Sequence, residues 1–181
     1  MIPRPSPLKS AIAALRIRQW TKNGVILVPL LFAYEVFTRE LLMRALIATA
    51  AFSLLASGVY IANDWIDRER DRLHPEKRHR PIAAGHLSGM SAALLLCAVW
   101  AAALGLGSWL GVAFTATMGA YLLLQALYST VLKHLVILDV MAIALGFIAR
   151  VVAGASAISV HVSNWLFLCT LLLSIFLGFA K

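Results

Sequence analysis

The residues best suited to chemistry lie between positions 63 and 81, where a dense polar stretch follows a long apolar run. Within it, Asn63, Asp67 and Asp71 recur every four residues. If the helix of the preceding run continues, their side chains share one face and drift by only about 40° per step. Oxygen ligands on one face suit a hard divalent cation, and Mg²⁺ typically takes one or two carboxylates plus phosphate oxygens of a substrate. The sequence therefore predicts a magnesium site at these three residues.

Basic residues follow directly after these acids. Lys77, Arg78 and Arg80 are natural counter-charges for phosphate groups. Another interpretation is a positively charged loop that fixes the membrane topology, with acids that balance its excess of arginine. That interpretation explains the basic residues, but it does not explain acids at helical spacing that begin where an apolar run ends. Polar residues at membrane depth are functional by default, which favours a metal–phosphate site.

Composition places the chain in a membrane. Of its 181 residues, 61% are apolar, and the mean hydropathy is +0.86; a soluble domain is only about half apolar. The net charge of +8 could suggest nucleic acid. However, the charged segments alternate with apolar runs, which favours lipid headgroups and a phosphorylated substrate as partners, and no nucleic acid. Cys97 and Cys169 lie in apolar runs and predict no disulfide framework, and no cleavable signal peptide is recognised.

The apolar runs predict an all-α fold, a polytopic transmembrane bundle that forms a single integral membrane domain over residues 1–181. An amphipathic helix from Ser10 is expected to lie at the cytoplasmic interface. Pro29 is expected to kink the first span. About six spans are predicted, at residues 24–37, 41–62, 88–107, 109–127, 135–158 and 165–180.

Charge asymmetry predicts the orientation in the cell membrane. With the N-terminus in the cytoplasm, thirteen of the sixteen Lys and Arg residues lie on the cytoplasmic side. The connection between the fourth and fifth spans then faces the same side as the acids. Its Tyr128 and Lys133 are predicted to be a second phosphate-contacting group. Arg18 and Lys22 flank the entry to the first span, where a membrane anchor is the simpler interpretation of their spacing.

Two charged residues fall inside the fifth span. Asp139 needs a cation, a hydrogen-bond network or a water-filled cavity, and Lys133 or the central loop could provide the partner. A structural ion pair and a role in the site explain Asp139 equally well. For Arg150, a stabilising partner or snorkelling to the outer interface is the expected explanation.

These residues resemble the UbiA superfamily of intramembrane prenyltransferases, whose first aspartate-rich motif has the spacing Asn63-x3-Asp67-x3-Asp71. Other segments are similar to the decaprenyl-phosphate phosphoribosyltransferase branch of that superfamily. Together with the first motif they cover nearly the whole chain. These segments are Arg18-Gln19-Trp20-Thr21-Lys22-Asn23, His74-Pro75-x-Lys77-Arg78-x-Arg80-Pro81, Tyr128-Ser129-x3-Lys133-His134 and Gly146-Phe147-x2-Arg150.

The resemblance implies nine helical spans around a cavity open to the cytoplasm and to lipid. It also implies magnesium-dependent transfer of 5-phosphoribose from phosphoribosyl diphosphate to a polyprenyl (decaprenyl) phosphate, releasing diphosphate, for cell-envelope precursor synthesis. Asn63, Asp67 and Asp71 would hold Mg²⁺ on the donor diphosphate, and Tyr128 would orient the donor. Asp67, Asp71, Tyr128 and Lys133 would be the catalytic residues. The implied phosphate contacts are Lys22, Lys77, Arg78, Arg80 and Lys133.

The chain departs from the family pattern after the sixth predicted span. The family continues into further helices and a second aspartate-rich motif, so the chain is expected to be the N-terminal part of such a domain, possessing half of the metal-binding cavity. Two other functions remain open: a UbiA-type transferase that moves a polyprenyl group onto an aromatic acceptor, and a non-enzymatic truncated membrane protein such as a small transporter or assembly partner. A homo-oligomer is also left open.

Overall fold

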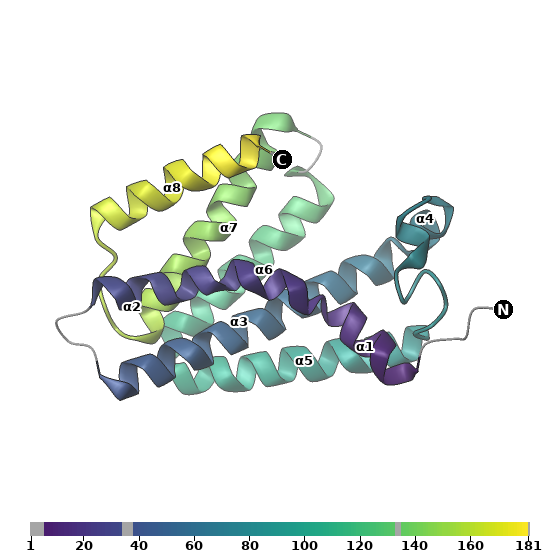
Figure 1. Cartoon of the computed structure of the whole chain (residues 1–181), viewed down its shortest axis with the longest axis horizontal. Coiled ribbons are helices and arrows are strands. Elements are labelled where there is room, and N and C mark those ends of the chain that lie inside the picture. Colours follow the sequence, from purple (N-terminus) through teal and green to yellow (C-terminus); the bar gives the residue numbers. More distant parts are fainter. Residues whose placement is uncertain (1–5, 34–37, 133–134, 181) are drawn as a thin grey trace.

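The computed structural model describes residues 6–33, 38–132 and 135–180, and within these ranges it contains helices and no strand (Figure 1). In chain order the elements are α1 (Pro7–Leu15), the 3₁₀ helix η1 (Ile17–Leu27), α2 (Val28–Phe32), α3 (Arg39–Ile66), α4 (Arg68–Leu73), the short 3₁₀ helix η3 (Lys77–His79), α5 (Gly89–Leu110), α6 (Val112–Thr130), α7 (Val136–Ala157) and α8 (Asn164–Phe179). The predicted all-α fold class is confirmed.

Several helices begin where the sequence places a hydroxyl group. The side chains of Thr38, Ser88 and Ser163 each accept a hydrogen bond from the backbone N–H three residues later, at 3.1 to 3.2 Å. Each bond satisfies one of the amide groups that lack a partner in the first turn of a helix. Between α5 and α6 the chain reverses at Gly111, whose φ of 119° is open to glycine and costly for other residues. The two helices are therefore separated by a single residue.

Four helices are long and apolar enough to cross a membrane: α3, α5, α6 and residues 137–157 of α7. A shorter apolar helix, α8, occupies the position of the sixth predicted span. The first predicted span differs most from its prediction. In place of one helix over 24–37, η1 continues to Leu27 and α2 begins with Pro29 in its first turn, where proline's missing N–H costs nothing. Residues 34–37 lie outside the described ranges.

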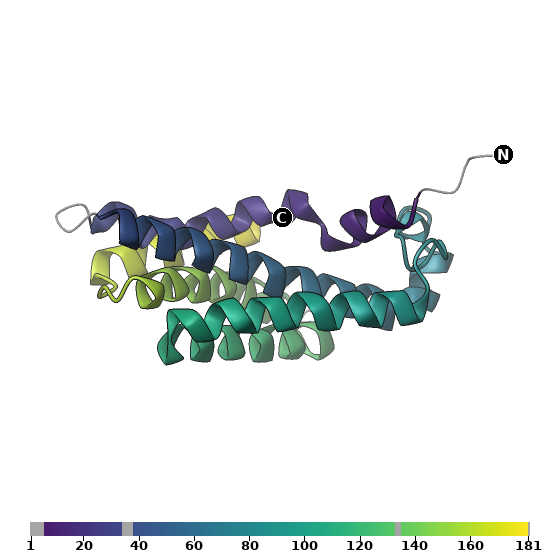
Figure 2. The same cartoon turned by 90° about the horizontal axis from the view of Figure 1, so that it is seen from below.

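Helix α3 forms the centre of the bundle. It packs against α5, η1, α7 and α1, and its Phe52 and Leu55 belong to the main buried cluster together with Phe114 and Met118 from α6. Figure 2 shows η1 and α2 on one side of the bundle and α5 and α6 on the other, with α3 and α7 between them. The central helices therefore contact both layers, and the side chains of α3 and α7 can meet those of η1 inside the bundle.

The contact between η1 and α7 depends on a glycine. A Cβ atom at Gly154 of α7 would lie 2.0 Å from the backbone carbonyl oxygen of Ile26 in η1. Any larger residue would therefore force the two backbones apart. This close approach places the side chains of η1 next to those of α7, which matters for the site described below.

The N-terminal helix α1 lies at the same end of the molecule as α4 (Figure 1). It begins three residues before the predicted start at Ser10, and Ser10 and Ala14 are the residues buried against the bundle. Leu8 and Ile12 point away from the bundle and are 70% and 45% exposed, whereas Leu15 packs against a buried cluster that contains Ala14 and Ile61. Ser10, Ala14 and Leu15 therefore attach α1 to the bundle, and Leu8 and Ile12 remain available to an interface.

Candidate anion-binding cavity

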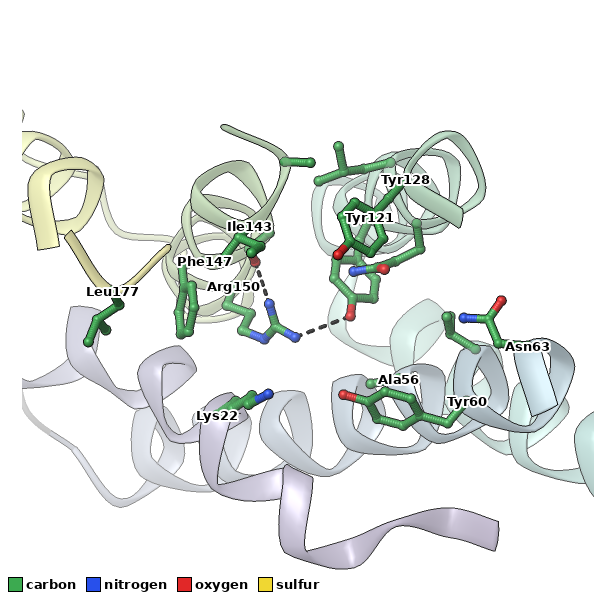
Figure 3. A pocket seen from close by; sticks show the side chains of 15 residues that line it. Lys22, Ala56, Tyr60, Asn63, Tyr121, Tyr128, Ile143, Phe147, Arg150 and Leu177 are labelled. Carbon is green, nitrogen blue, oxygen red and sulfur yellow. Dashed lines mark hydrogen bonds between the residues drawn. The ribbon is translucent and has the colours of Figure 1, made fainter. Parts of the chain in front are cut away.

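A cavity of about 600 Å³ lies between η1, α3, α6, α7 and α8 (Figure 3). Much of its wall is apolar, and includes Val59 of α3, Ile143 of α7 and Leu177 of α8. A few polar side chains converge on it from several helices, as is typical of ligand sites. These polar side chains are Lys22, Tyr60, Asn63, Tyr121, Gln125, Tyr128 and Arg150.

Arg150 is the buried cation of this cavity, with 7% of its surface exposed. Its Nε donates to Oδ1 of Asn23 at 2.8 Å, its Nη1 to the carbonyl oxygen of Gly146 at 2.6 Å, and its Nη2 to the hydroxyl of Tyr121 at 3.1 Å. All three acceptors are neutral. Among the residues that the structure describes, no carboxylate forms an ion pair with Arg150.

The surroundings of Arg150 hold its guanidinium group in place. Its carbon lies 5.1 Å from the ring centre of Tyr121, 5.4 Å from that of Phe147 and 5.9 Å from that of Phe52. Asn23, brought in by η1, is itself fixed because its Nδ2 donates to Oγ of Ser53 at 3.0 Å. Aromatic faces and neutral acceptors stabilise a cation less than a carboxylate would. The cavity therefore contains a fixed positive charge suited to an anionic ligand.

The other end of the cavity lies where α3 approaches its C-terminus. Here Asn63 lines the wall, and Oγ of Ser129 donates to its Oδ1 at 3.2 Å. Tyr128, the neighbour of Ser129 on α6, donates its hydroxyl proton to Oδ1 of Asp139 at 2.8 Å. The last turn of α6 thus positions two groups of the cavity wall.

Beyond Asn63, the chain keeps helical backbone bonds through the end of α3 into α4. The N–H of Asp67 donates to the carbonyl of Asn63, and the N–H of Asp71 to the carbonyl of Asp67, both at 2.9 Å. The predicted four-residue ladder is therefore present in the backbone. The three side chains differ in their surroundings: Asn63 reaches the cavity, Asp67 is half-buried, and Asp71 is buried.

Two partly buried arginines and two buried aspartates form a network next to this ladder, here called the arginine–aspartate cluster: Arg16, Asp64, Asp71 and Arg80. Nη1 of Arg80 donates to Oδ1 of Asp64 at 3.0 Å and to Oδ2 of Asp71 at 2.7 Å. Arg16, in the turn between α1 and η1, donates to the same oxygen of Asp64. Both carboxylates are nearly inaccessible, with 4% of each side chain exposed. Opposite charges balance in this cluster, which ties the N-terminal segment to the loop after α4.

Comparison with known proteins agrees with the fold. The model of the UbiA prenyltransferase family matches residues 24–180. The chain belongs to the UbiA prenyltransferase family. Its curated relatives include decaprenyl-phosphate phosphoribosyltransferase of Corynebacterium glutamicum, 36% identical over 94% of this chain and 52% of the relative. Another is the protein of the same name from Mycolicibacterium smegmatis, 34% identical over 99% of this chain and 58% of the relative. The chain thus spans little more than half the length of these two relatives.

Among solved structures, a UbiA homolog from Archaeoglobus fulgidus bound to DMAPP and Mg²⁺ matches with a TM-score of 0.74. The match covers 93% of this chain and 61% of the homolog at 19% identity, and it establishes the UbiA fold. The predicted family, the helical membrane fold and the resemblance to the phosphoribosyltransferase branch are therefore confirmed.

The structure brings together only part of the predicted UbiA site. Lys22, Asn63 and Tyr128 line the cavity. Lys77 and Arg78 are exposed on η3 and do not line it. Lys133 lies outside the described residues, so its predicted roles in catalysis and phosphate contact stay predictions.

Two of the residues predicted to bind ligand or metal form an ion pair with each other. Arg80, predicted to contact phosphate, and Asp71, predicted to bind Mg²⁺, form an ion pair in the arginine–aspartate cluster. Within the part of the chain that the structure describes, no three His, Cys, Asp or Glu side chains converge as a metal site. The amide oxygen of Asn63 and the carboxylate of Asp67, which lies outside the cluster, are the donors that suit a hard cation. The magnesium site stays a prediction, with these two residues as its best-placed members.

Sequence reasoning missed Arg150 as a cavity residue and missed the role of Asp64. The expectation that Arg150 snorkels to the outer interface is wrong, because Asn23 and Tyr121 hold it inside the bundle. The other expectation, a stabilising partner, is confirmed. For Asp64 a signal was present: it lies seven residues before Asp71, which places the two on the same side of a helix. For Arg150 the partner Asn23 is 127 residues away, and no local pattern indicates it.

Proposed function

We propose that the cavity binds phosphoribosyl diphosphate with Mg²⁺, and that the protein transfers its 5-phosphoribosyl group to a polyprenyl phosphate. The names of the relatives from Corynebacterium and Mycolicibacterium support this reaction class. The observation that carries the proposal is Arg150, a buried cation of the cavity held by neutral acceptors. A ligand with several phosphate groups supplies the negative charge that this cation lacks.

Lys22 adds a second cation to the same cavity wall, on the η1 side. Arg150 is fixed and buried, whereas Lys22 is exposed, so the two differ in how strongly water screens their charge. We propose that Arg150 fixes one phosphate group of the ligands and that Lys22 attracts and neutralises another. Two phosphorylated substrates require more than one such contact.

Asn63 and Asp67 would hold Mg²⁺, which supplies charge neutralisation on the leaving diphosphate. Ser129 fixes the amide of Asn63 for this purpose through its hydrogen bond to Oδ1. Asp71 remains a third candidate ligand, and it would have to leave Arg80 to take part.

The reaction needs little proton chemistry. An oxygen of the polyprenyl phosphate attacks the anomeric carbon of the donor, a new carbon–oxygen bond forms, and the bond to the diphosphate breaks with its electron pair on the diphosphate. The attacking oxygen is already anionic, so no strong general base is required. The cavity would act by positioning the two phosphorylated substrates and by stabilising the charge of the leaving diphosphate.

The lipid acceptor fits the setting of the cavity. Leu177 of α8 and Phe147 of α7 are apolar parts of its wall, and α8 exposes large apolar side chains such as Phe176 and Leu173. A polyprenyl chain can lie along such a surface within the bilayer. We further propose that the protein lies in the plasma membrane. Its N-terminus would face the cytoplasm, as the distribution of lysine and arginine predicts.

The proposal is tested by incorporation of labelled phosphoribosyl diphosphate into polyprenyl phosphate, using membranes that contain the chain and added Mg²⁺. Because the chain covers only 52% and 58% of the two relatives, a second preparation joins it to the C-terminal part of the Corynebacterium relative. Lipid-linked label in either preparation that Asp67→Asn abolishes supports the transferase. The matched control is Glu69→Gln, because Glu69 is an exposed acid of α4, two residues after Asp67, and its ion pairs lie outside the cavity.

Label in the joined preparation alone means that the chain is the donor-binding part of a longer enzyme. Absence of label in both, with transfer from geranyl diphosphate to an aromatic acceptor instead, overturns the proposal. It would favour the aromatic prenyltransferase, since prenyl transfer is the reaction that the family's name gives.

A further inference from the structure

We propose that Tyr60 of α3 is a further substrate-binding residue: its hydroxyl donates a hydrogen bond to the diphosphate of the donor, and Arg16 holds its ring for this contact. The inference rests on the proposed function for the nature of the donor. It concerns a residue that neither the four-residue ladder nor the resemblance to the UbiA superfamily indicates. Tyr60 lies between the cavity and the arginine–aspartate cluster, and it contacts both.

Tyr60 belongs to the face of α3 that lines the cavity. Val59, Tyr60 and Asn63 are all part of the wall, at the spacing of one helix face. Tyr60 therefore lies one turn before Asn63, which is one of the two best-placed residues for Mg²⁺. Figure 3 shows the hydroxyl of Tyr60 directed into the cavity, toward the space that the charged ends of Lys22 and Arg150 also enter.

The position of Tyr60 along α3 is between the predicted metal site and the buried cation. The guanidinium group of Arg150 lies against the ring of Phe52, about two turns before Tyr60 on the same helix. Asn63 lies one turn after Tyr60. A diphosphate that binds Mg²⁺ at Asn63 and approaches Arg150 therefore comes next to the Tyr60 hydroxyl.

The proton of this hydroxyl is available to a ligand. In the part of the chain that the structure describes, the Tyr60 hydroxyl forms no hydrogen bond. Within the same part, every side-chain nitrogen or oxygen that is sealed off from solvent has a partner, so the Tyr60 oxygen is open to the cavity. A tyrosine hydroxyl inside a protein usually finds a partner, which leaves this one to be satisfied from the cavity.

A phosphate group is the acceptor that this proton suits best. Phosphate oxygens are negatively charged acceptors, and a hydrogen bond to a charged oxygen is shorter and stronger than one between neutral groups. A sugar hydroxyl is a neutral acceptor, and a prenyl chain offers none. The contact therefore favours the diphosphate, which is the part of the donor that carries the most negative charge.

Arg16 fixes the ring of Tyr60 from the side of the cluster. Its guanidinium carbon lies 4.9 Å from the centre of the ring, and its Nη2 donates to Asp64, four residues after Tyr60 on α3. A cation over an aromatic face is attracted to it, which restrains the ring. The positive charge also favours negative charge on the phenol oxygen, so the hydroxyl becomes a better donor. The cluster thus supports one wall of the cavity while its own charges remain balanced.

The experiment measures binding to the full chain in lipid nanodiscs with Mg²⁺. The ligands are inorganic diphosphate, phosphoribosyl diphosphate and farnesyl phosphate, whose single phosphate group represents the acceptor. In Tyr60→Phe, inorganic diphosphate and phosphoribosyl diphosphate should both bind about tenfold more weakly, because one charge-assisted hydrogen bond is lost. Farnesyl phosphate should bind within a factor of two of the wild type. The melting curve without ligand should match that of the wild type, since the hydroxyl has no hydrogen bond within the described residues.

The matched control is Thr49→Val, which also removes a hydroxyl from α3 with little change of shape. The Thr49 hydroxyl donates to the backbone carbonyl of Ala45 in its own helix, and Thr49 does not line the cavity. Its loss should leave the binding of all three ligands within a factor of two of the wild type. Equal losses of diphosphate binding in Thr49→Val and Tyr60→Phe would attribute the effect to a disturbed helix and overturn the inference.

The role of Arg16 is tested by a double-mutant cycle. Arg16→Gln should weaken the binding of inorganic diphosphate about threefold in the wild-type background and leave it unchanged in the Tyr60→Phe background. Arg16→Gln also loses the ion pair with Asp64, but damage from that loss would weaken binding equally in both backgrounds. An equal effect in both backgrounds would therefore show that Arg16 does not act through Tyr60.

The outcomes separate this inference from the proposed function. If phosphoribosyl diphosphate binds equally well to the wild type and to Tyr60→Phe, the inference is wrong and the proposed function stands. If phosphoribosyl diphosphate does not bind, but geranyl diphosphate binds and loses tenfold in Tyr60→Phe, the proposed function is wrong and Tyr60 still binds a diphosphate. If the wild type binds no diphosphate at all, both are wrong.

Two further results would also overturn the inference. A loss for phosphoribosyl diphosphate without a loss for inorganic diphosphate would place the contact on the sugar, and a tenfold loss for farnesyl phosphate would place it on the acceptor. Should Tyr60→Phe not fold, 3-fluorotyrosine incorporated at Tyr60 retains the hydroxyl and still decides the matter. Its ¹⁹F resonance should shift when inorganic diphosphate and Mg²⁺ are added and should not shift with farnesyl phosphate. An unchanged resonance with diphosphate would contradict the contact.

Discussion

Two regions of this molecule hold an arginine charge inside the fold, partly buried in one and buried in the other, and the partners of the charge differ between them. In the arginine–aspartate cluster, Arg80 meets the carboxylates of Asp64 and Asp71, and Arg16 meets Asp64 as well. In the cavity, Arg150 meets an amide, a backbone carbonyl and a phenol. The cluster is electrically balanced by the chain itself. Under the proposed function a ligand balances the charge of Arg150 in the cavity, so the first region would serve structure and the second would serve binding.

This difference shows which of the predicted ligand residues already have a charged partner and which face the cavity. Asp71 and Arg80 were both predicted to contact the ligand or its metal, yet each satisfies the other's charge. Asn63 and Lys22, from the same predicted set, face the cavity. A charged residue that is already matched by a buried partner must break that contact before it can bind anything else, and breaking it costs free energy.

The largest effect on stability is expected from Asp64→Ala. It removes the carboxylate shared by Arg16 and Arg80, which leaves the partly buried Arg16 without its carboxylate partner and Arg80 with Asp71 alone, and this should cost about 3 kcal/mol of unfolding free energy. Thermal unfolding in detergent measures this loss. The control Glu69→Ala breaks exposed ion pairs and should change stability by less than about 1 kcal/mol. Equal stability of the two variants would show that the cluster is not a structural element.

Arg150→Met should mainly weaken ligand binding, whereas Asp64→Ala should mainly lower stability. The donor should bind about a hundredfold more weakly, because the contact of a phosphate group with a buried cation is lost. Stability should fall less than in Asp64→Ala, since the residues around Arg150 are neutral and lose no ion pair. Titration with phosphoribosyl diphosphate and a melting curve on the same sample test both statements. A variant that melts early but binds normally would assign Arg150 to structure and contradict the comparison.

The same substitution, Asp to Asn, can be made at two positions of the four-residue ladder, Asp67 and Asp71, and compared. Asp71→Asn should mainly reduce stability, because it weakens the ion pair with Arg80. Asp67→Asn should leave stability nearly unchanged and raise the Mg²⁺ concentration needed for donor binding by about tenfold. Magnesium titrations and melting curves for both variants distinguish these effects. If Asp71→Asn also raises the Mg²⁺ requirement tenfold, Asp71 is a ligand and leaves Arg80 when the metal binds.

The smallest effect is expected from Ser129→Ala. It removes the hydrogen bond that orients the amide of Asn63, worth about 1 kcal/mol. The Mg²⁺ requirement should rise about fivefold, while the affinity for the donor at saturating Mg²⁺ should stay within a factor of two of the wild type. Thr130→Ala is the matched control, because its hydroxyl bonds to the backbone of its own helix. A similar response in both variants would show that the effect comes from the helix end and not from Asn63.

Most of the helices could be predicted from the sequence, because their signals are local. Apolar runs of membrane length predicted α3, α5, α6 and α7, and capping hydroxyls such as Thr38 and Ser88 lie at the starts of helices. The first span was the exception. Residues 24–33 are apolar enough for a span, but Pro29 and the 3₁₀ geometry of η1 divide the segment, and the hydropathy pattern does not carry that information.

Composition and four-residue spacing by themselves determined that the protein is a helical membrane protein with an acidic ladder at the end of its second span. The backbone bonds from Asn63 to Asp67 and on to Asp71 follow from helical repetition, which depends on neighbouring residues alone. Only the tertiary structure decided which charges are matched. Arg16 reaches Asp64 across 48 residues of sequence, and Asn23 reaches Arg150 across 127. The second contact exists because Gly154 lets the backbone of η1 lie directly against α7. A pairing of this kind depends on the packing of whole helices, and the sequence around each residue does not specify it.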